Sequence, residues 1–268
     1  MQENYHIVTP TGKKKPILVS VPHCGTAFPT DIAKHYKAQQ IAQVDDTDFF
    51  VHKIYDFVTE MGITLIYAHY SRWVIDLNRS PINKALYTDG RIITGLTPTT
   101  DFLGNALYHS KDVEPDFEEI ERRKLLYFQS YYDKVTEILT EFKSEFGTAI
   151  LWDAHSIRRL VPTIHDKPFP NFILGTNDGK SASDSLIQAA KKGLQSSTYE
   201  LSYNTPFKGG NITRHFGKPK VGVHALQLEM IKTLYMDDAE VQYHVGRANQ
   251  LRHTLKNTLE LLVEAASC

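Results

Sequence analysis

Ala149-Ile150-Leu151-Trp152 passes directly into Asp153-Ala154-His155-Ser156, and this succession is the clearest structural signal in the chain. A short apolar run predicts a buried strand, and polar side chains immediately after it predict a loop at the end of that strand. Ile17-Leu18-Val19-Ser20-Val21 followed by Pro22-His23-Cys24-Gly25 repeats the arrangement. Together the two segments predict a sheet whose strands end in polar loops.

The rest of the chain alternates between further strand patterns and helix patterns. Apolar runs predict strands at 64–68, 72–77 and 221–230. Helical patterns predict helices at 51–58, 183–193 (with Gly193 as its stop) and 238–266, and either one long helix or two shorter ones at 114–146. Alternation of this kind is typical of an α/β fold. We expect a mixed, mainly parallel sheet flanked by helices on both faces. No linker or repeat interrupts the pattern, so residues 1–268 are expected to form one domain.

Composition excludes several classes of protein. The 268 residues are 41% hydrophobic and 23% charged, with a formal net charge of -1, so neither nucleic acid nor an anionic membrane is an expected partner. The 2 cysteines are too few for a disulfide framework, and no apolar run has the length of a signal core or a membrane span. We expect a cytoplasmic protein, monomeric or a small homo-oligomer.

Two histidines and an acid are candidates for metal ligands. His23 and His155 each follow a predicted strand, and both would lie on the same rim if those strands are parallel. Zinc hydrolases commonly use three His and carboxylate ligands and leave a fourth position for water. Asp48 is the preferred third ligand, with Asp45 and Asp46 as alternatives. An acid at a helix start is also favoured by the helix dipole alone, so spacing by itself does not establish the site.

Glu229 is the candidate general base. The segment 223–230 alternates, and Glu229 lies on a strand whose neighbours are largely apolar. A carboxylate there either forms an ion pair or has a raised pKa suited to accepting a proton from an activated water. Cys24 beside His23 raises a second possibility, a cysteine nucleophile with His155 as its base. Adjacent side chains leaving a strand diverge, which disfavours it.

Polar residues near turns and strand ends are candidates for binding a charged substrate. Asn78-Arg79 follows an apolar run, and a guanidinium fork there would bind a carboxylate through two hydrogen bonds. Arg72, Lys208 and Arg214 are further candidates. The alternative for each of them is a surface ion pair.

Seven motifs in order resemble one known family, the N-formylglutamate amidohydrolases. The resemblance extends from about Pro16 to Met236 and is most specific in the fourth and sixth of these motifs. They are Ser20-Val21-Pro22-His23-Cys24-Gly25; Asp46-Thr47-Asp48; Tyr70-Ser71-Arg72 with Asp76-Leu77-Asn78-Arg79; Leu151-Trp152-Asp153-Ala154-His155-Ser156-Ile157-Arg158; Leu174-Gly175-Thr176-Asn177; Phe207-Lys208-Gly209-Gly210-Asn211-Ile212-Thr213-Arg214-His215; and His224-Ala225-Leu226-Gln227-Leu228-Glu229.

The resemblance implies a fold similar to the zinc carboxypeptidase and aspartoacylase group. By motif match it implies a divalent metal, Zn²⁺, on His23, Asp48 and His155, with Glu229 as the base and Asn78-Arg79 as the carboxylate clamp. The implied reaction is hydrolysis of N-formyl-L-glutamate to formate and L-glutamate, in histidine degradation. The alternatives are another zinc N-acyl amino acid deacylase or a metallo-carboxypeptidase on this scaffold. A non-catalytic small-molecule-binding protein is a third hypothesis, against which a retained base argues.

Overall fold

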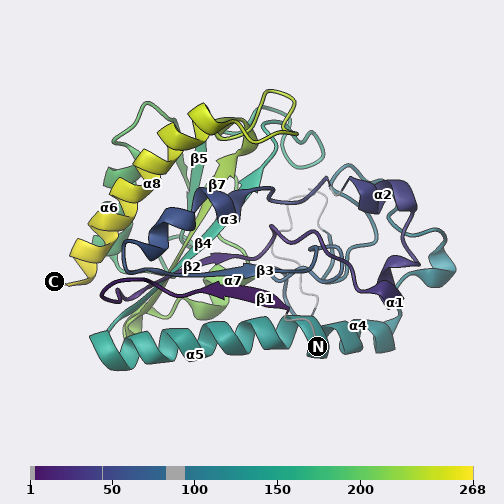
Figure 1. The fold of residues 1–268 in the computed structure, drawn as a ribbon, viewed down its shortest axis with the longest axis horizontal. Helices are drawn as coiled ribbons and strands as arrows, with labels where there is room; N and C mark the ends of the chain where they lie inside the picture. Colours follow the sequence, from purple (N-terminus) through teal and green to yellow (C-terminus); the bar gives the residue numbers. More distant parts are fainter. Residues whose placement is uncertain (1–3, 44, 83–93, 268) are drawn as a thin grey trace.

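The protein is described by a computed structural model that covers residues 4–43, 45–82 and 94–267. In these ranges one sheet has the strand order β1-β3-β2-β4-β7-β5-β6 (Figure 1). Strands β3, β2, β4 and β7 run parallel to one another, while β1 and the β5–β6 pair run the opposite way. The bounds are β1 Tyr5–Val8, β2 Ile17–Val21, β3 Thr64–Ala68, β4 Ala149–Ile157, β5 Phe172–Gly175, β6 Leu201–Tyr203 and β7 Val223–Ile231. The prediction of a mixed, mainly parallel sheet is confirmed.

Helices cover both faces of this sheet, as expected. Figure 1 shows α5 along one face and α6 and α8 along the other. The bounds are α1 Thr30–Ala33, α2 Ala38–Ala42, α3 Val51–Ile54, α4 Phe117–Arg123, α5 Gln129–Phe146, α6 Asp184–Leu194, α7 Asn211–Phe216 and α8 Val245–Ala266. A π-helical turn, Lys124–Phe128, joins α4 to α5. Short 3₁₀ turns lie at Asp56–Thr59, Lys111–Val113, Pro219–Val221 and Lys232–Leu234.

The central strands are buried on both faces because alternate residues enter two separate apolar cores. Val19 and Trp152 pack toward α6 and α8, whereas their neighbours Leu18 and Leu151 pack toward α5. Continuous apolar runs are expected of parallel strands that helices cover on both sides. None of the helices in the described ranges is long and apolar enough to cross a bilayer.

Three expectations about local structure were wrong. Residues 72–77 form turns, not a strand, because Trp73 and Val74 pack into a small separate core outside the sheet. Gly193 lies inside α6 and does not end it. A Cβ there would lie 2.5 Å from the Cα of Thr258, so this glycine permits close packing of α6 on α8. Strand β4 continues to Ile157, which places His155 within the strand and not in a loop after it.

Candidate metal centre

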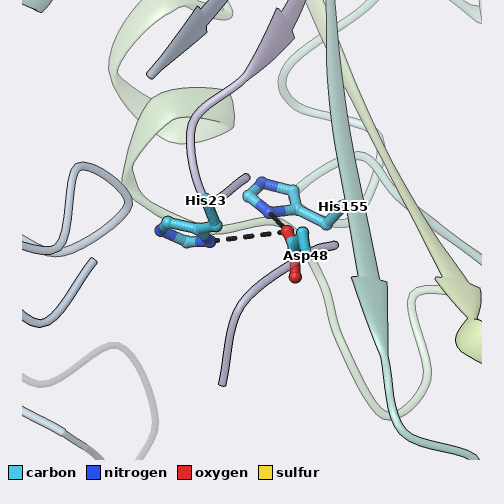
Figure 2. Close-up of side chains that lie close together, drawn as sticks. All are labelled: His23, Asp48 and His155. Carbon is cyan, nitrogen blue, oxygen red and sulfur yellow. Dashed lines mark hydrogen bonds and ion pairs between the residues drawn. The ribbon is translucent and has the colours of Figure 1, made fainter. Parts of the chain in front are cut away.

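Three buried side chains from distant parts of the chain meet at the carboxyl ends of β2 and β4. His23, Asp48 and His155 each offer a ligand atom, and these atoms all lie within 4.8 Å of one another (Figure 2). The parallel pairing of β2 with β4 brings the two histidines to the same edge. The backbone N–H of Asp48 donates to the carbonyl of His23 at 2.9 Å and holds the acid beside the rings. Such a set of two imidazoles and a carboxylate suits a zinc site with an open fourth position.

The two nitrogens of each imidazole have different partners. Nδ1 of His155 and Nδ1 of His23 lie 3.2 Å and 3.8 Å from Oδ2 of Asp48. Nε2 of His23 lies 2.8 Å from Asp76, and Nε2 of His155 lies 3.0 Å from Asp153. A metal-binding imidazole commonly donates its second N–H to a carboxylate, which fixes the tautomer and leaves the first nitrogen for the ion. Both histidines have this arrangement.

His23 provides a direct test of whether the site fits a metal ion. In the described part of the chain, Nδ1 of His23 is buried without a hydrogen-bond partner. Buried polar atoms are almost always satisfied, so an orphaned nitrogen beside a carboxylate calls for a missing ligand. The residues present therefore fit a divalent cation.

The two acids that competed with Asp48 for the metal have other partners. Asp46 accepts hydrogen bonds from Nε1 of Trp73 at 3.0 Å and from the backbone of Phe102. Asp45 forms an ion pair with Arg158. Only Asp48 of the three belongs to the cluster with the two histidines.

Electrostatics differ sharply between the two histidines. Burial, followed by the charge of Arg72, lowers the pKa of His23 to about 4 and favours the neutral imidazole that a metal requires. Burial also opposes charge on His155, but Asp153 and Asp48 outweigh it and hold the pKa of His155 well above its ordinary value. Without an ion, His155 is thus a cation between two carboxylates. A bound metal would replace that proton.

Glu229 faces the cluster from the adjacent strand. In the β4–β7 ladder it is the direct partner of His155, so the two side chains project from the same face of the sheet. Within the described ranges Oε2 of Glu229 is buried and has no hydrogen-bond partner. Burial raises the pKa of Glu229 to about 8, although the charge of His155 acts to lower it. The carboxyl group is thus poised between protonated and ionised forms near neutral pH.

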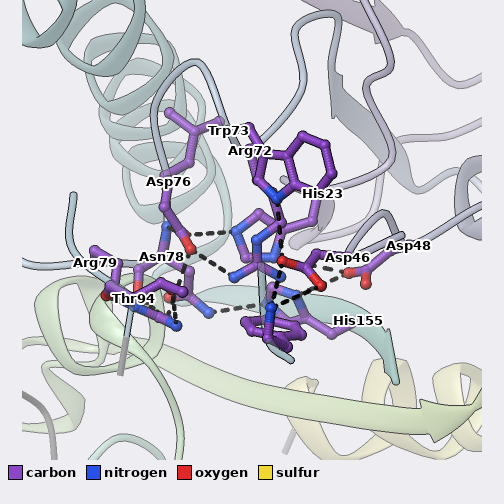
Figure 3. Close-up of polar contacts among 12 residues, drawn as sticks. His23, Asp46, Asp48, Arg72, Trp73, Asp76, Asn78, Arg79, Thr94 and His155 are labelled. Atoms are coloured by element: carbon purple, nitrogen blue, oxygen red, sulfur yellow. Dashed lines mark hydrogen bonds and ion pairs between the residues drawn. The ribbon is translucent and has the colours of Figure 1, made fainter. Parts of the chain in front are cut away.

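Asp76 is a buried carboxylate that gathers positive charge beside His23. Arg72 donates to it at 2.5 Å, and Nη1 of Arg79 lies 3.8 Å away (Figure 3). Arg79 also donates to the carbonyl and hydroxyl of Thr94. The two arginines balance the carboxylate that orients the first histidine.

Asn78 connects this cluster to α7. Its Oδ1 accepts from the backbone of Ile212 at 2.8 Å, while its Nδ2 lies 3.0 Å from Nε2 of His155 and 3.3 Å from Gln227. A Cβ at Gly210 would meet Nδ2 of Asn78 at 2.3 Å, which explains the glycine in this segment. The backbone of the Gly-Gly segment thereby packs directly on Asn78.

Comparison with known proteins shows the family to which the chain belongs. The family model described as N-formylglutamate amidohydrolase matches residues 15–236. The chain belongs to the N-formylglutamate amidohydrolase family. Its relatives include the N-formylglutamate deformylases of Pseudomonas aeruginosa, 40% identical over 255 residues, and of Pseudomonas putida, 36% identical over 251 residues; each match covers 92% of both chains. The crystal structure of N-formylglutamate amidohydrolase from Ralstonia eutropha JMP134 has the same fold, with a TM-score of 0.81, 23% identity and 97% of each chain covered.

Two candidate substrate-binding residues of this family member have other contacts. Lys208 pairs with Asp178 at 3.0 Å, and both side chains are about half exposed. Nε of Arg214 donates to the carbonyl of Gly209 at 2.9 Å. The three predicted metal ligands and Glu229 are brought together at the carboxyl ends of the central strands.

Sequence reasoning missed the two carboxylates that hold the imidazoles. Asp153 stands two residues before His155 on the same strand, so strand parity alone would have placed both on one face. Asp76 has no comparable signal, because it reaches His23 from a turn 53 residues away. Cys24 is buried, and burial raises the pKa of its thiol, which argues against a nucleophile.

Proposed function

We propose that this protein hydrolyses the amide bond of N-formyl-L-glutamate, giving formate and L-glutamate, with a divalent metal ion, Zn²⁺, as cofactor. The proposal rests on the convergence of His23, Asp48 and His155 around one point, where Nδ1 of His23 has no hydrogen-bond partner among the described residues. Two relatives at 40% and 36% identity are N-formylglutamate deformylases, which supports the choice of substrate.

Nδ1 of His23, Nδ1 of His155 and the carboxylate of Asp48 would hold the metal. When bound, the ion supplies a Lewis acid that lowers the pKa of a coordinated water and polarises the acyl oxygen. Asp76 and Asp153 keep the Nε2 protons of the two histidines, so that each Nδ1 lone pair faces the ion.

Glu229 is the proposed general base and acid. Its carboxylate accepts a proton from the attacking water and later delivers that proton to the departing amine nitrogen. The paired position beside His155 keeps the carboxylate on the metal side of the sheet. Burial excludes competing water from it, which strengthens every charge interaction in the site.

Positive and amide groups would bind the two carboxylates of the substrate. Arg79 and Asn78 remain the proposed clamp, supported by Arg72, Arg214 and Lys208. The positive charge of the three arginines and Lys208 favours an acidic amino acid over a neutral one.

The decisive experiment measures metal content and turnover together. The purified protein is stripped with a chelator, reloaded with Zn²⁺, and assayed for formate release from N-formyl-L-glutamate. We expect one metal per chain and activity only in the loaded form. N-acetyl-L-glutamate and a glutamyl dipeptide in the same assay separate a deformylase from a general deacylase or a carboxypeptidase. Metal-independent turnover, or metal binding without turnover of any of these substrates, would contradict the proposal.

A further inference from the structure

A second group of cations lies just beyond the metal centre, at the carboxyl ends of β4 and β7. Arg158 follows His155 by three residues, and Lys232 follows Glu229 by three residues. Both line one small pocket, whose wall also includes two acids, Asp45 and Asp46, and the apolar residues Phe102, Leu103, Ile157 and Val161. Since β4 and β7 are parallel, the pocket adjoins the edge that carries the metal ligands and the base.

Lys232 is buried, and no carboxylate of the described residues forms an ion pair with it. It is 2% exposed, and its Nζ donates to the backbone carbonyl of Asp45 at 3.2 Å. That is its one hydrogen bond, and it forms no ion pair, among the residues described. A buried ammonium group normally has a carboxylate partner, because its desolvation is costly. The position therefore suits an anion that arrives from outside the protein.

Arg158 adds a second unsatisfied donor to the same pocket. Its guanidinium pairs with Asp45 through Nη2, yet Nε is buried with no partner in the described part of the chain. The nearby carboxylate of Asp46 already accepts from Trp73 and Phe102. Arg158 is about a third exposed, whereas Lys232 is buried. The two like charges repel one another, and a bound anion would offset that repulsion.

We infer that Arg158 and Lys232 bind the side-chain carboxylate of the substrate and set the preference for an acidic side chain. The two acids in the wall are already engaged, Asp45 by Arg158 and Asp46 by Trp73. The apolar part of the wall with Lys232 beside it matches two methylene groups that end in a carboxylate. This inference rests on the proposed function. It assigns the distal carboxylate to a pocket separate from the Asn78-Arg79 clamp, which is then left to the α-carboxylate.

Lys232→Met tests the assignment because it keeps most of the unbranched side chain and removes the ammonium group. The assay compares kcat/KM for N-formyl-L-glutamate with that for N-formyl-L-glutamine, its neutral isostere. Loss of one partner of a buried ion pair lowers kcat/KM by about 30-fold or more. We expect that loss for the glutamate substrate and less than about 3-fold change for the glutamine substrate. Arg158→Gln should act in the same direction, and the exposed Lys180→Met is the matched control.

Binding of the products separates this inference from the proposed function. Calorimetry with Zn²⁺-loaded protein compares L-glutamate with L-glutamine in wild type and Lys232→Met. If wild-type protein hydrolyses neither formyl substrate, the proposed function fails. The relative affinities for L-glutamate and L-glutamine then decide alone whether Arg158 and Lys232 bind a side-chain carboxylate. A preference for glutamate that Lys232→Met abolishes supports it. An equal loss of affinity for L-glutamate and L-glutamine, or an unchanged preference for L-glutamate, overturns the assignment.

Discussion

Removing the charge of Lys232 should stabilise the metal-free protein at neutral pH. Burial lowers the pKa of this ammonium from 10.5 to about 8. An amine whose pKa is lower in the folded state holds its proton less firmly there than in the unfolded chain. At pH 7 the group is charged in both states, and the folded protein bears the full desolvation cost. Met at this position has no charge to desolvate.

The size and sign of the effect follow from the two pKa values. The interval between 10.5 and about 8 corresponds to roughly 3 kcal/mol of unfolding free energy. Below about pH 8 the cost is constant. As pH rises from about 8 to 10.5, the folded protein loses its proton first, and wild-type stability recovers. The difference in unfolding free energy between Lys232→Met and wild type should therefore be largest at pH 7 and should disappear by about pH 10.5.

Urea unfolding at a series of pH values between 7 and 10.5 measures this gap. Other titrating groups contribute equally to both proteins, so the difference isolates Lys232. Lys180→Met, which changes an exposed lysine, should give no such difference. A Lys232→Met protein that is less stable than wild type at pH 7, or a gap that does not change with pH, would refute the reasoning. Lys232 would then be satisfied in the folded state, and no anion would be needed beside it.

Three further substitutions test the metal centre and the packing that supports it. Asp153→Asn should weaken Zn²⁺ affinity by about 10- to 100-fold, measured by chelator competition, because it removes the carboxylate that holds Nε2 of His155; unchanged affinity would show that the contact does not orient the ring. Glu229→Gln should retain bound metal but lower kcat about a hundredfold or more, and a near-normal rate would exclude it as the base. Gly193→Ala should cost about 1–3 kcal/mol in urea unfolding, because the new Cβ would lie 2.5 Å from the Cα of Thr258; wild-type stability would mean that the helices separate freely.

Sequence predicted correctly those strands that are apolar because helices cover both faces of the sheet. Apolar runs at 17–21 and 149–152 are buried on both faces, which only central strands of a covered sheet require. At 72–77 Trp73 and Val74 are equally buried, but against Tyr36 and Tyr108 outside the sheet. An apolar pattern indicates that a segment is buried but not which part of the protein it packs against. The predicted strand at 72–77 was therefore wrong.

The same distinction applies to the candidate site. His23, His155 and Glu229 were found because each lies at or near the end of a strand, where parallel topology gathers side chains. Asp76 and Lys232 lie in turns, and their contacts with His23 and Asp45 form only when the chain folds. Sequence spacing does not indicate these contacts. Lys232 became visible only once its burial was known.

The position of β7 has a consequence for how the molecule comes together. This strand is the last in the chain, yet it is inserted between β4 and β5, and β5 with β6 reaches the rest of the sheet only through it. A nascent chain that ends before Val223 holds two unconnected parts of a sheet and lacks Glu229 altogether. Both the continuous sheet and the full set of proposed reacting groups therefore require one late event, the insertion of this strand.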